Sequence, residues 1–320
     1  MKSKICGWLS VLMLAGLGAQ AMHAGNGLPV SSNRYASLSV QGSVGLLNGS
    51  AVETVYTAVE GSRYKLSELD WDIKDVVMVG GTLSICVQNQ IWLNAGLWGA
   101  ATQGNGQMND WDWLMEEQGS PWTHWSLSEV DITRASLLDF NVAVEVIRVG
   151  GLGVRGIAGY KYNAWKWEDH GLRHIYSAGG GFRNDVSDDD GSTGIIYEQW
   201  FHIPYIGGGL NYTNGNWAVD AYALLGPYVT AKDRDQHLFR DLLFEEDFSG
   251  GQYYGVGVRS TYTLPGGVFL SAALDGQMIP EIVGDTTLIN QRTGAQETST
   301  GTAGIENQVW MLSLAGGYKF

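Results

Sequence analysis

The chain of 320 residues is acidic, with 33 aspartates and glutamates against 19 lysines and arginines and a formal charge of −14. This charge argues against nucleic acid as a partner and favours cationic peptides or basic protein segments. The 45 glycines, 13 tryptophans and 15 tyrosines, set against six prolines, are typical of many strands that are apolar on one face only.

The first 24 residues have the pattern of a secretory signal. Two lysines precede an apolar run at 5–17, and small residues follow it, so we expect cleavage between residues 21 and 24. No later stretch offers about 18 uninterrupted apolar residues, so a membrane-spanning helix is not expected. The remaining chain, 25–320, then forms one barrel domain in which Cys86 is the only thiol, and no internal disulfide can form.

The rest of the chain alternates with a period of two. In 36–46, apolar or small side chains alternate with serine and glutamine, and 217–225 and 268–275 repeat the pattern. The last segment, 310–320, places Trp310, Leu312, Leu314, Gly316, Tyr318 and Phe320 on one face and ends on an aromatic residue. A buried terminal strand of a soluble sandwich is the alternative. Many such strands behind a signal predict an outer-membrane barrel.

Turn signals and polar stretches alternate along the chain. The short turns lie near 88–89, 150–151, 213–216 and 265–267. The long polar stretches lie at 48–67, 102–127, 167–195, 231–251 and 280–305. Nine connections give ten antiparallel strands, an even number as expected for a transmembrane β-barrel. We interpret the five long stretches as extracellular loops and place both chain ends in the periplasm.

Two polar stretches carry residues suited to hydrolysis. Asp110 and Asp112 lie in the second stretch, between strands three and four, whereas Asp235 and His237 lie in the fourth, between strands seven and eight. Four positions apart on a ring of ten, they are expected to face each other across one opening. Glu53 lies in the first stretch. Counted across the closing pair of strands, it is likewise four strand positions from the fourth stretch.

The residue types favour water as the nucleophile, because no serine, cysteine or metal-ligand cluster stands beside His237. An imidazole can take a proton from water as it attacks, and Asp235, two residues earlier on the same face of an extended segment, can orient the ring. Asp110 and Asp112 tend to share a proton, because like charges disfavour simultaneous ionisation. Which of the two donates to the oxyanion is left open.

Several motifs resemble the omptins, outer-membrane proteases of Gram-negative bacteria. They are Asp-x-Asp-Trp at 110–113, Asp-x-Asp-x-His at 233–237, and the segments beginning at Gly181, Pro204 and Gly304. The resemblance covers essentially the whole mature chain. It implies an all-β ten-stranded barrel, no cofactor or metal, and an endopeptidase that cleaves beside basic residues of peptide or protein substrates. It also assigns catalysis to Asp110, Asp112, Asp235 and His237, and the floor of the pocket for the basic side chain to Glu53 and Asp233.

Other interpretations stay open. The same acidic residues could be solvated loop charges, and the chain could be a non-catalytic adhesin that binds host proteins through acidic loops. An outer-membrane lipid hydrolase is weaker, because no serine stands with a histidine. The run 188–190 lacks the spacing of an EF-hand calcium loop. His170 and His174, four apart, would suit a metal on a helix, but no helical pattern is present; His124 and His202 are unassigned.

One departure from the family concerns lipid. Several omptins carry basic residues on the outer wall that hold lipopolysaccharide phosphates and are needed for activity. The matching positions here are Ala164, Trp200 and Ser249, none of them basic. We therefore expect outer-membrane lipid around the barrel, but lipopolysaccharide dependence is in doubt or is met by other contacts.

Overall fold

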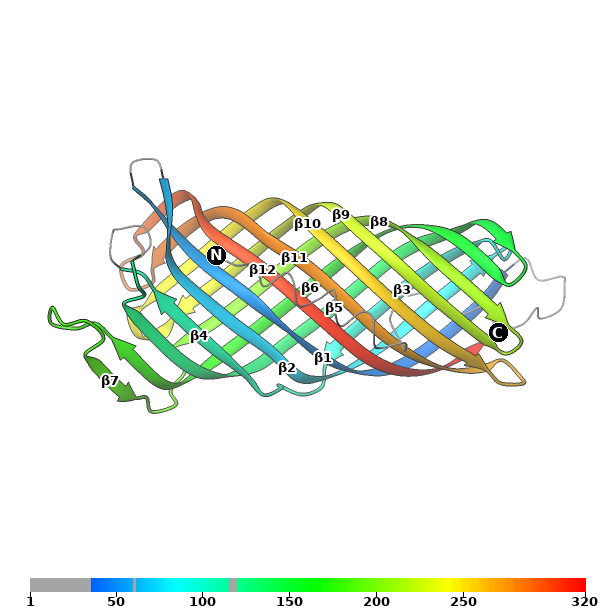
Figure 1. Ribbon diagram of the computed structural model, residues 1–320, viewed down its shortest axis with the longest axis horizontal. Helices are drawn as coiled ribbons and strands as arrows, with labels where there is room; N and C mark the ends of the chain where they lie inside the picture. Colours follow the sequence, from blue (N-terminus) through cyan, green and yellow to red (C-terminus); the bar gives the residue numbers. More distant parts are fainter. Residues whose placement is uncertain (1–35, 60–61, 115–119) are drawn as a thin grey trace.

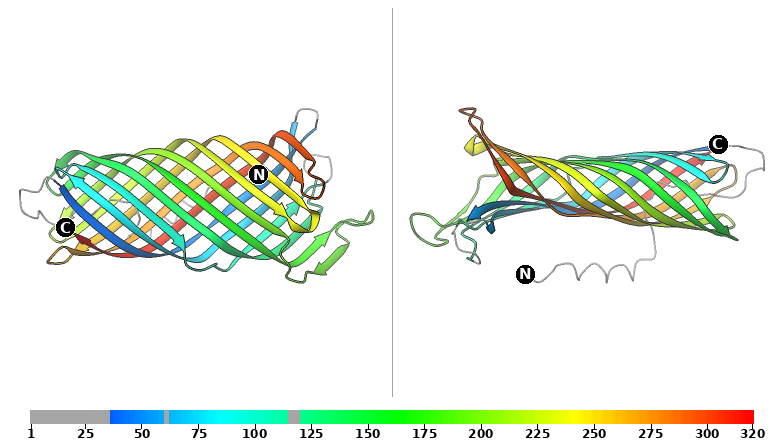
Figure 2. Two further views of the ribbon diagram at one scale, coloured as in Figure 1. Left: turned by 180° about the vertical axis from the view of Figure 1, so that it is seen from behind. Right: turned by 90° about the horizontal axis from the view of Figure 1, so that it is seen from above.

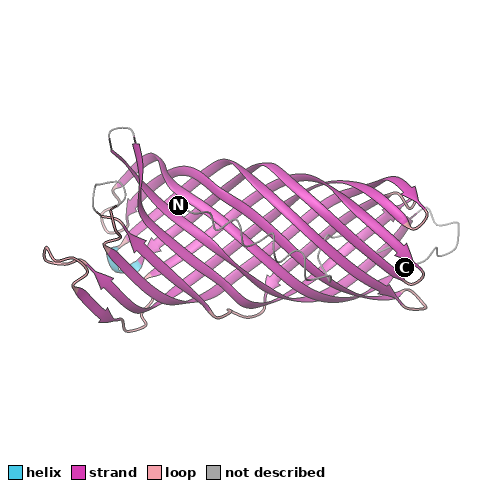
Figure 3. Cartoon of the chain, in the orientation of Figure 1, coloured by secondary structure: helices cyan, strands magenta, loops and turns pink. Residues whose placement is uncertain are grey.

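The computed structural model describes residues 36–59, 62–114 and 120–320, so the expected signal segment, 1–24, lies outside the described residues. Strands make up most of the described chain (Figures 1 and 3). They are β1 (Ala36–Val59), β2 (Ser62–Val87), β3 (Ile91–Ala100), β4 (Gly106–Asp112), β5 (His124–Val149), β6 (Leu152–Tyr176), β7 (Asp185–Asp188), β8 (Ile195–Asn214), β9 (Trp217–His237), β10 (Leu242–Thr263), β11 (Val268–Asn290) and β12 (Gln296–Lys319).

The strands close into one antiparallel barrel. Each strand pairs with its neighbour in the chain, and β12 returns to pair with β1. β3 and β4 both lie between β2 and β5 and are two pieces of one strand, interrupted at 101–105. β7 is a short arm on β6, outside the ring. The ring therefore has ten positions, as the sequence predicted. Among the described residues, no helix is long and apolar enough to cross a membrane.

The four predicted short turns are confirmed, but the interpretation of the long polar stretches as loops is wrong for most of their length. The strands on either side of them run on through these stretches, and most strands are 20 to 26 residues long. As a result, Asp110 and Asp112 lie on β4, and Asp235 and His237 on β9. The physical reason is that, beyond the lipid, the outer face of a strand contacts water and carries polar side chains, so the outward apolar positions are lost while backbone pairing continues.

Apolar side chains cover the outer wall over only part of its height. Large exposed examples include Leu97, Phe140, Ile206 and Leu314, and most of the others lie at the same level. We call this level the membrane half; it comprises 36–46, 77–100, 138–162, 204–228, 251–281 and 311–320. The strand segments and loops beyond it, at the end away from the short turns, form the rim. The two ends of the elongated barrel are seen in Figure 2.

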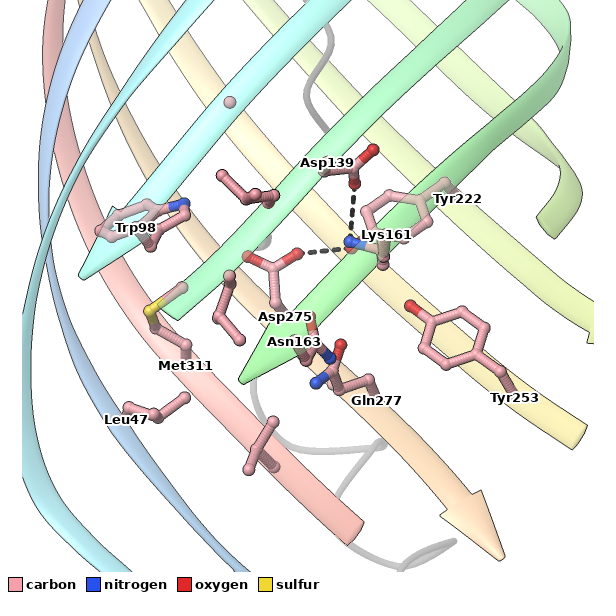
Figure 4. A pocket seen from close by; sticks show the side chains of 15 residues that line it. Leu47, Trp98, Asp139, Lys161, Asn163, Tyr222, Tyr253, Asp275, Gln277 and Met311 are labelled. Carbon is pink, nitrogen blue, oxygen red and sulfur yellow. Dashed lines mark hydrogen bonds and ion pairs between the residues drawn. The ribbon is translucent and has the colours of Figure 1, made fainter. Parts of the chain in front are cut away.

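The interior of the membrane half is filled with paired polar groups. Lys161 Nζ lies 2.6 Å from a carboxylate oxygen of Asp139, and Tyr205 donates to the same carboxylate at 2.6 Å. Tyr222 donates to Asp275 on the facing wall of a small cavity of about 50 Å³ (Figure 4). A charge inside a barrel is tolerated when an opposite charge or a hydrogen bond compensates for lost hydration. These contacts close the lumen beneath the rim.

Candidate active site

The aspartate pair projects from β4 into an open cavity at the rim. Asp110 and Asp112 are two residues apart on one strand, so both point to the same face, and both line a cavity of about 760 Å³. β4 pairs with β2, which lets Ser67 Oγ donate to Asp110 at 3.2 Å. Burial, with the neighbouring charge of Asp112, raises the pKa of Asp110 to about 8. Burial also raises the pKa of Asp112.

The Asp–His pair projects from the end of β9. Asp235 Oδ2 lies 2.5 Å from His237 Nε2, and the aspartate is 2% exposed. The ring of Phe244 packs edge-on against the imidazole of His237, with 5.4 Å between the ring centroids. The guanidinium of Arg240 contacts Nδ1 on the other side of the ring. Because a guanidinium can only donate, Nδ1 accepts this bond, and Nε2 carries the proton given to Asp235.

The structure brings these two pairs together. Asp110, Asp112, Asp235 and His237 all line the same cavity, on opposite walls of the ring. Their charges act on one another, because Asp235 raises the pKa of Asp110 and His237 lowers that of Asp112. The juxtaposition expected from counting strands is therefore present, although the residues lie on strands rather than in loops.

Glu53 and Asp233 lie close together, with Asp233 deeper than the cavity lining. Glu53 is 1% exposed and lines the cavity, whereas Asp233 is 3% exposed and accepts from Tyr197 OH at 2.9 Å. Burial raises the pKa of Glu53 well above its usual value, and the charges of Asp235 and Asp233 raise it further. The structure thus places both predicted pocket residues beneath the Asp–His pair.

Sequence reasoning missed a third carboxylate, Glu246. It lies directly opposite Asp233 in the β9–β10 pairing and accepts from Thr286 Oγ1 at 2.8 Å. Burial raises the pKa of Glu246 to about 7, and Glu246 raises that of Asp233. The signal was hairpin register: a turn at 238–241 pairs His237 with Leu242, and hence Asp233 with Glu246. Treating 231–251 as one loop concealed it.

The other histidines separate into cavity and outer-wall positions. His174 pairs with Asp189 at 2.8 Å and lines the cavity with His124. His170 lies 3.4 Å from Asp131, and His202 contacts Tyr160 on the outer wall. In the described part of the chain, no group of three or more histidine, cysteine or acidic side chains is arranged to hold a metal ion.

A ten-stranded membrane barrel whose open end sets an Asp–His pair against two aspartates belongs to the class of outer-membrane barrel enzymes. The omptin family model matches residues 34–320, and the chain belongs to the omptin family.

Several relatives in this family are named as proteases. The chain is 31% identical to the plasminogen activator of Yersinia pestis, over 89% of this chain and 90% of that protein. It is 28% identical to the outer membrane protease OmpP of Escherichia coli, over 88% and 90%. The crystal structure of the outer membrane protease OmpT from Escherichia coli matches the fold with a TM-score of 0.84 at 24% identity, covering 91% of this chain and 99% of that one.

Proposed function

We propose that the protein is an endopeptidase that cleaves peptides and proteins beside arginine or lysine, with water as the nucleophile. The observation that carries this proposal is the common cavity: an aspartate pair, an Asp–His pair and a buried carboxylate, Glu53, all adjoin one opening. The names of the relatives add that such barrels act on proteins.

His237 is the base in this proposal. Asp235 holds Nε2, so Nδ1 is the nitrogen with a lone pair for the water proton. Arg240 donates to that lone pair, so its side chain must turn away before water can reach Nδ1. Asp235 then stabilises the imidazolium that forms. The raised pKa of Asp110 leaves one carboxyl of the pair protonated near neutral pH, able to donate to the oxyanion.

The three deep carboxylates account for a preference for basic side chains. Glu53 Oε2 is buried and accepts no hydrogen bond from the described residues, whereas the carboxyl groups of Asp233 and Glu246 lie in hydrogen-bond contact with each other just below it. A buried oxygen without a donor is costly, and a guanidinium or ammonium entering past Glu53 would supply donors and an opposite charge. We therefore assign Glu53, Asp233 and Glu246 to binding of the basic side chain before the scissile bond.

We further propose that the rim faces the outside of the cell. The short turns and the C-terminal end, where Phe320 N donates to Leu38 O, lie at the opposite end of the barrel. Outer-membrane barrels keep short turns on the periplasmic side and longer connections outside. This orientation gives extracellular peptides access to the cavity.

Lipopolysaccharide dependence is a separate prediction. Ala164 is buried, and the guanidinium of Arg134 of β5, which is paired with Glu198, lies 5.8 Å from the centre of the Trp200 ring. A phosphate contact at this wall would therefore use Arg134 rather than the three matching positions. Activity of the refolded barrel with and without added lipopolysaccharide, for wild type and Arg134→Ala, tests this contact.

The test of the function uses cells that display the full chain and a fluorogenic peptide containing Arg-Arg. We expect cleavage by wild type, and its loss in His237→Ala and Asp110→Ala. His202→Ala is the matched control, because this histidine lies on the outer wall away from the cavity. Equal cleavage by His237→Ala would contradict the proposal. Peptide binding that persists in all variants without cleavage would instead support the adhesin.

A further inference from the structure

The line from Asp110 to His237 divides the ring into two unequal arcs. One arc contains β2, β1, β12, β11 and β10, and it carries Glu53 and Glu246. The other arc contains β5, β6 and β8. Its cavity wall carries the aromatic and imidazole side chains His124, His174 and Tyr176. With Glu53 and Glu246 binding the side chain before the scissile bond, as proposed above, a peptide lying across this line puts the residue after the scissile bond in the second arc.

His174 points into the cavity because of a single inserted residue. β6 pairs Gly171 with Ser128 and Arg173 with Leu127, so Leu172 is an extra residue on that strand. Such a bulge exchanges the inner and outer faces of the strand beyond it. His170, before the bulge, therefore pairs with Asp131 on the outer wall, whereas His174 lines the cavity.

The strand register brings His174 to the level of the aspartate pair. Asp110 is paired with Ser126 of β5, and Ser126 is paired with His174 of β6. Adjacent strands lie about 5 Å apart, so the backbones at Asp110 and His174 are about 10 Å apart with both side chains toward the same cavity. That separation leaves room for a peptide bond between the two side chains.

Asp189 fixes the orientation of the ring. Asp189 Oδ1 lies 2.8 Å from His174 Nδ1, which leaves Nε2 for the cavity. The segment that carries Asp189 is tied back to β6, with Asp189 N donating to Leu172 O at 2.9 Å and Gly191 N to Gly171 O at 3.1 Å. Tyr176 stacks on the imidazole at 4.4 Å. His174 and Asp189 thus form a second His–Asp pair at the rim, on β6 in the short arc of the ring between the aspartate pair and His237.

We propose that His174 is a second catalytic histidine, which protonates the leaving amine while Asp189 positions it. This inference rests on the proposed function. An amine cannot leave an alkyl amide as an anion, so a proton must reach the nitrogen as the bond breaks. That nitrogen belongs to the residue after the scissile bond, which lies in the arc of His174. His124 is the other imidazole there, but its Nδ1 contacts Thr123 Oγ1, and among the described residues it forms no ion pair with a carboxylate.

The protons balance in this scheme. Water adds hydroxide to the carbonyl carbon and gives one proton to His237. The carbon–nitrogen bond then breaks, and the nitrogen takes a proton from Nε2 of doubly protonated His174. The products are a carboxylic acid and an amine. The proton on His237 returns through solvent to His174, so the site is restored without a further reactant.

The test compares two peptides of the same sequence, one with an amide and one with an ester at the scissile bond. An alkoxide leaves without full protonation, so the ester depends less on an acid. We expect His174→Ala to lower kcat for the amide about 10²-fold and for the ester much less. Asp189→Asn should also lower the ratio of kcat for the amide to kcat for the ester, by a smaller factor. His174→Gln repeats the test if the alanine variant does not fold.

His170→Ala is the matched control, since it removes the other His–Asp pair of β6 on the outer wall and should leave the ratio unchanged. Equal losses for amide and ester, no loss, or a shift in His124→Ala instead of His174→Ala would each overturn the inference. These outcomes differ from failure of the proposed function, in which wild type cleaves neither peptide.

Discussion

Buried charges are arranged differently in the membrane half and at the rim. Within the membrane half, Arg155 lies 3.1 Å from Asp220, and both side chains are almost fully buried. At the rim, the groups that act most on Glu53 and Asp233, after burial itself, are other carboxylates. Paired charges hold the barrel closed, whereas clustered like charges cost stability and are retained where a ligand supplies the missing charge.

The largest expected effect on activity comes from the orientation of the base. Asp235→Asn should lower kcat about 10⁴-fold, because the amide favours the wrong histidine tautomer while keeping the shape of the side chain. Single-turnover cleavage of the Arg-Arg peptide measures it. A variant with near wild-type turnover would separate His237 from the chemistry.

The membrane half should respond in stability instead. Arg155→Ala removes the ion pair of buried Asp220 and leaves it the hydrogen bond from Asn211 and the charge of Arg259, and we expect a loss of about 3 kcal/mol in the free energy of unfolding. The urea dependence of the folded band in unheated gel electrophoresis measures this loss. Turnover per folded molecule should be unchanged, and a large fall in turnover would break the contrast between the two halves.

Glu246→Gln should separate stability from binding at the rim. Removing one of the clustered carboxylates should raise the free energy of unfolding by about 1 kcal/mol. The same change should raise KM for a peptide with arginine before the scissile bond about tenfold, because a charged hydrogen-bond acceptor is lost. Glu245→Gln, on the outward face of the same strand, is the control. A fall in stability together with unchanged KM would refute the assignment.

The smallest expected effect is on the pH dependence of stability. Burial raises the pKa of Asp110 to about 8 and of Glu246 to about 7, above the ordinary values that these groups have in the unfolded chain. The native state therefore binds more protons in this window, and stability should fall as pH rises from about 4 to about 8. Asp110→Asn should flatten that slope, and a slope that steepens would contradict the assignment.

Much of the fold followed from local pattern. Period-two alternation and turn residues near 150–151 and 213–216 predicted ten strands, because lipid outside and polar groups inside require that alternation. The lengths of the strands could not be predicted from the pattern. Apolar alternation ends where the lipid ends, whereas backbone pairing between strands continues. The Asp–His pair could be predicted from spacing on one extended segment. Glu246 and His174 could not, because one depends on hairpin register and the other on a bulge at Leu172.

The most direct test of the central claim compares two peptides that differ in one group, with arginine or citrulline before the scissile bond. Citrulline keeps the shape of arginine and removes its charge. If the rim carboxylates bind a basic side chain beside the activated water, mass spectrometry should locate cleavage after arginine, and kcat/KM should fall about 10²-fold for citrulline. Equal rates for the two peptides, or cleavage elsewhere in the sequence, would contradict the account.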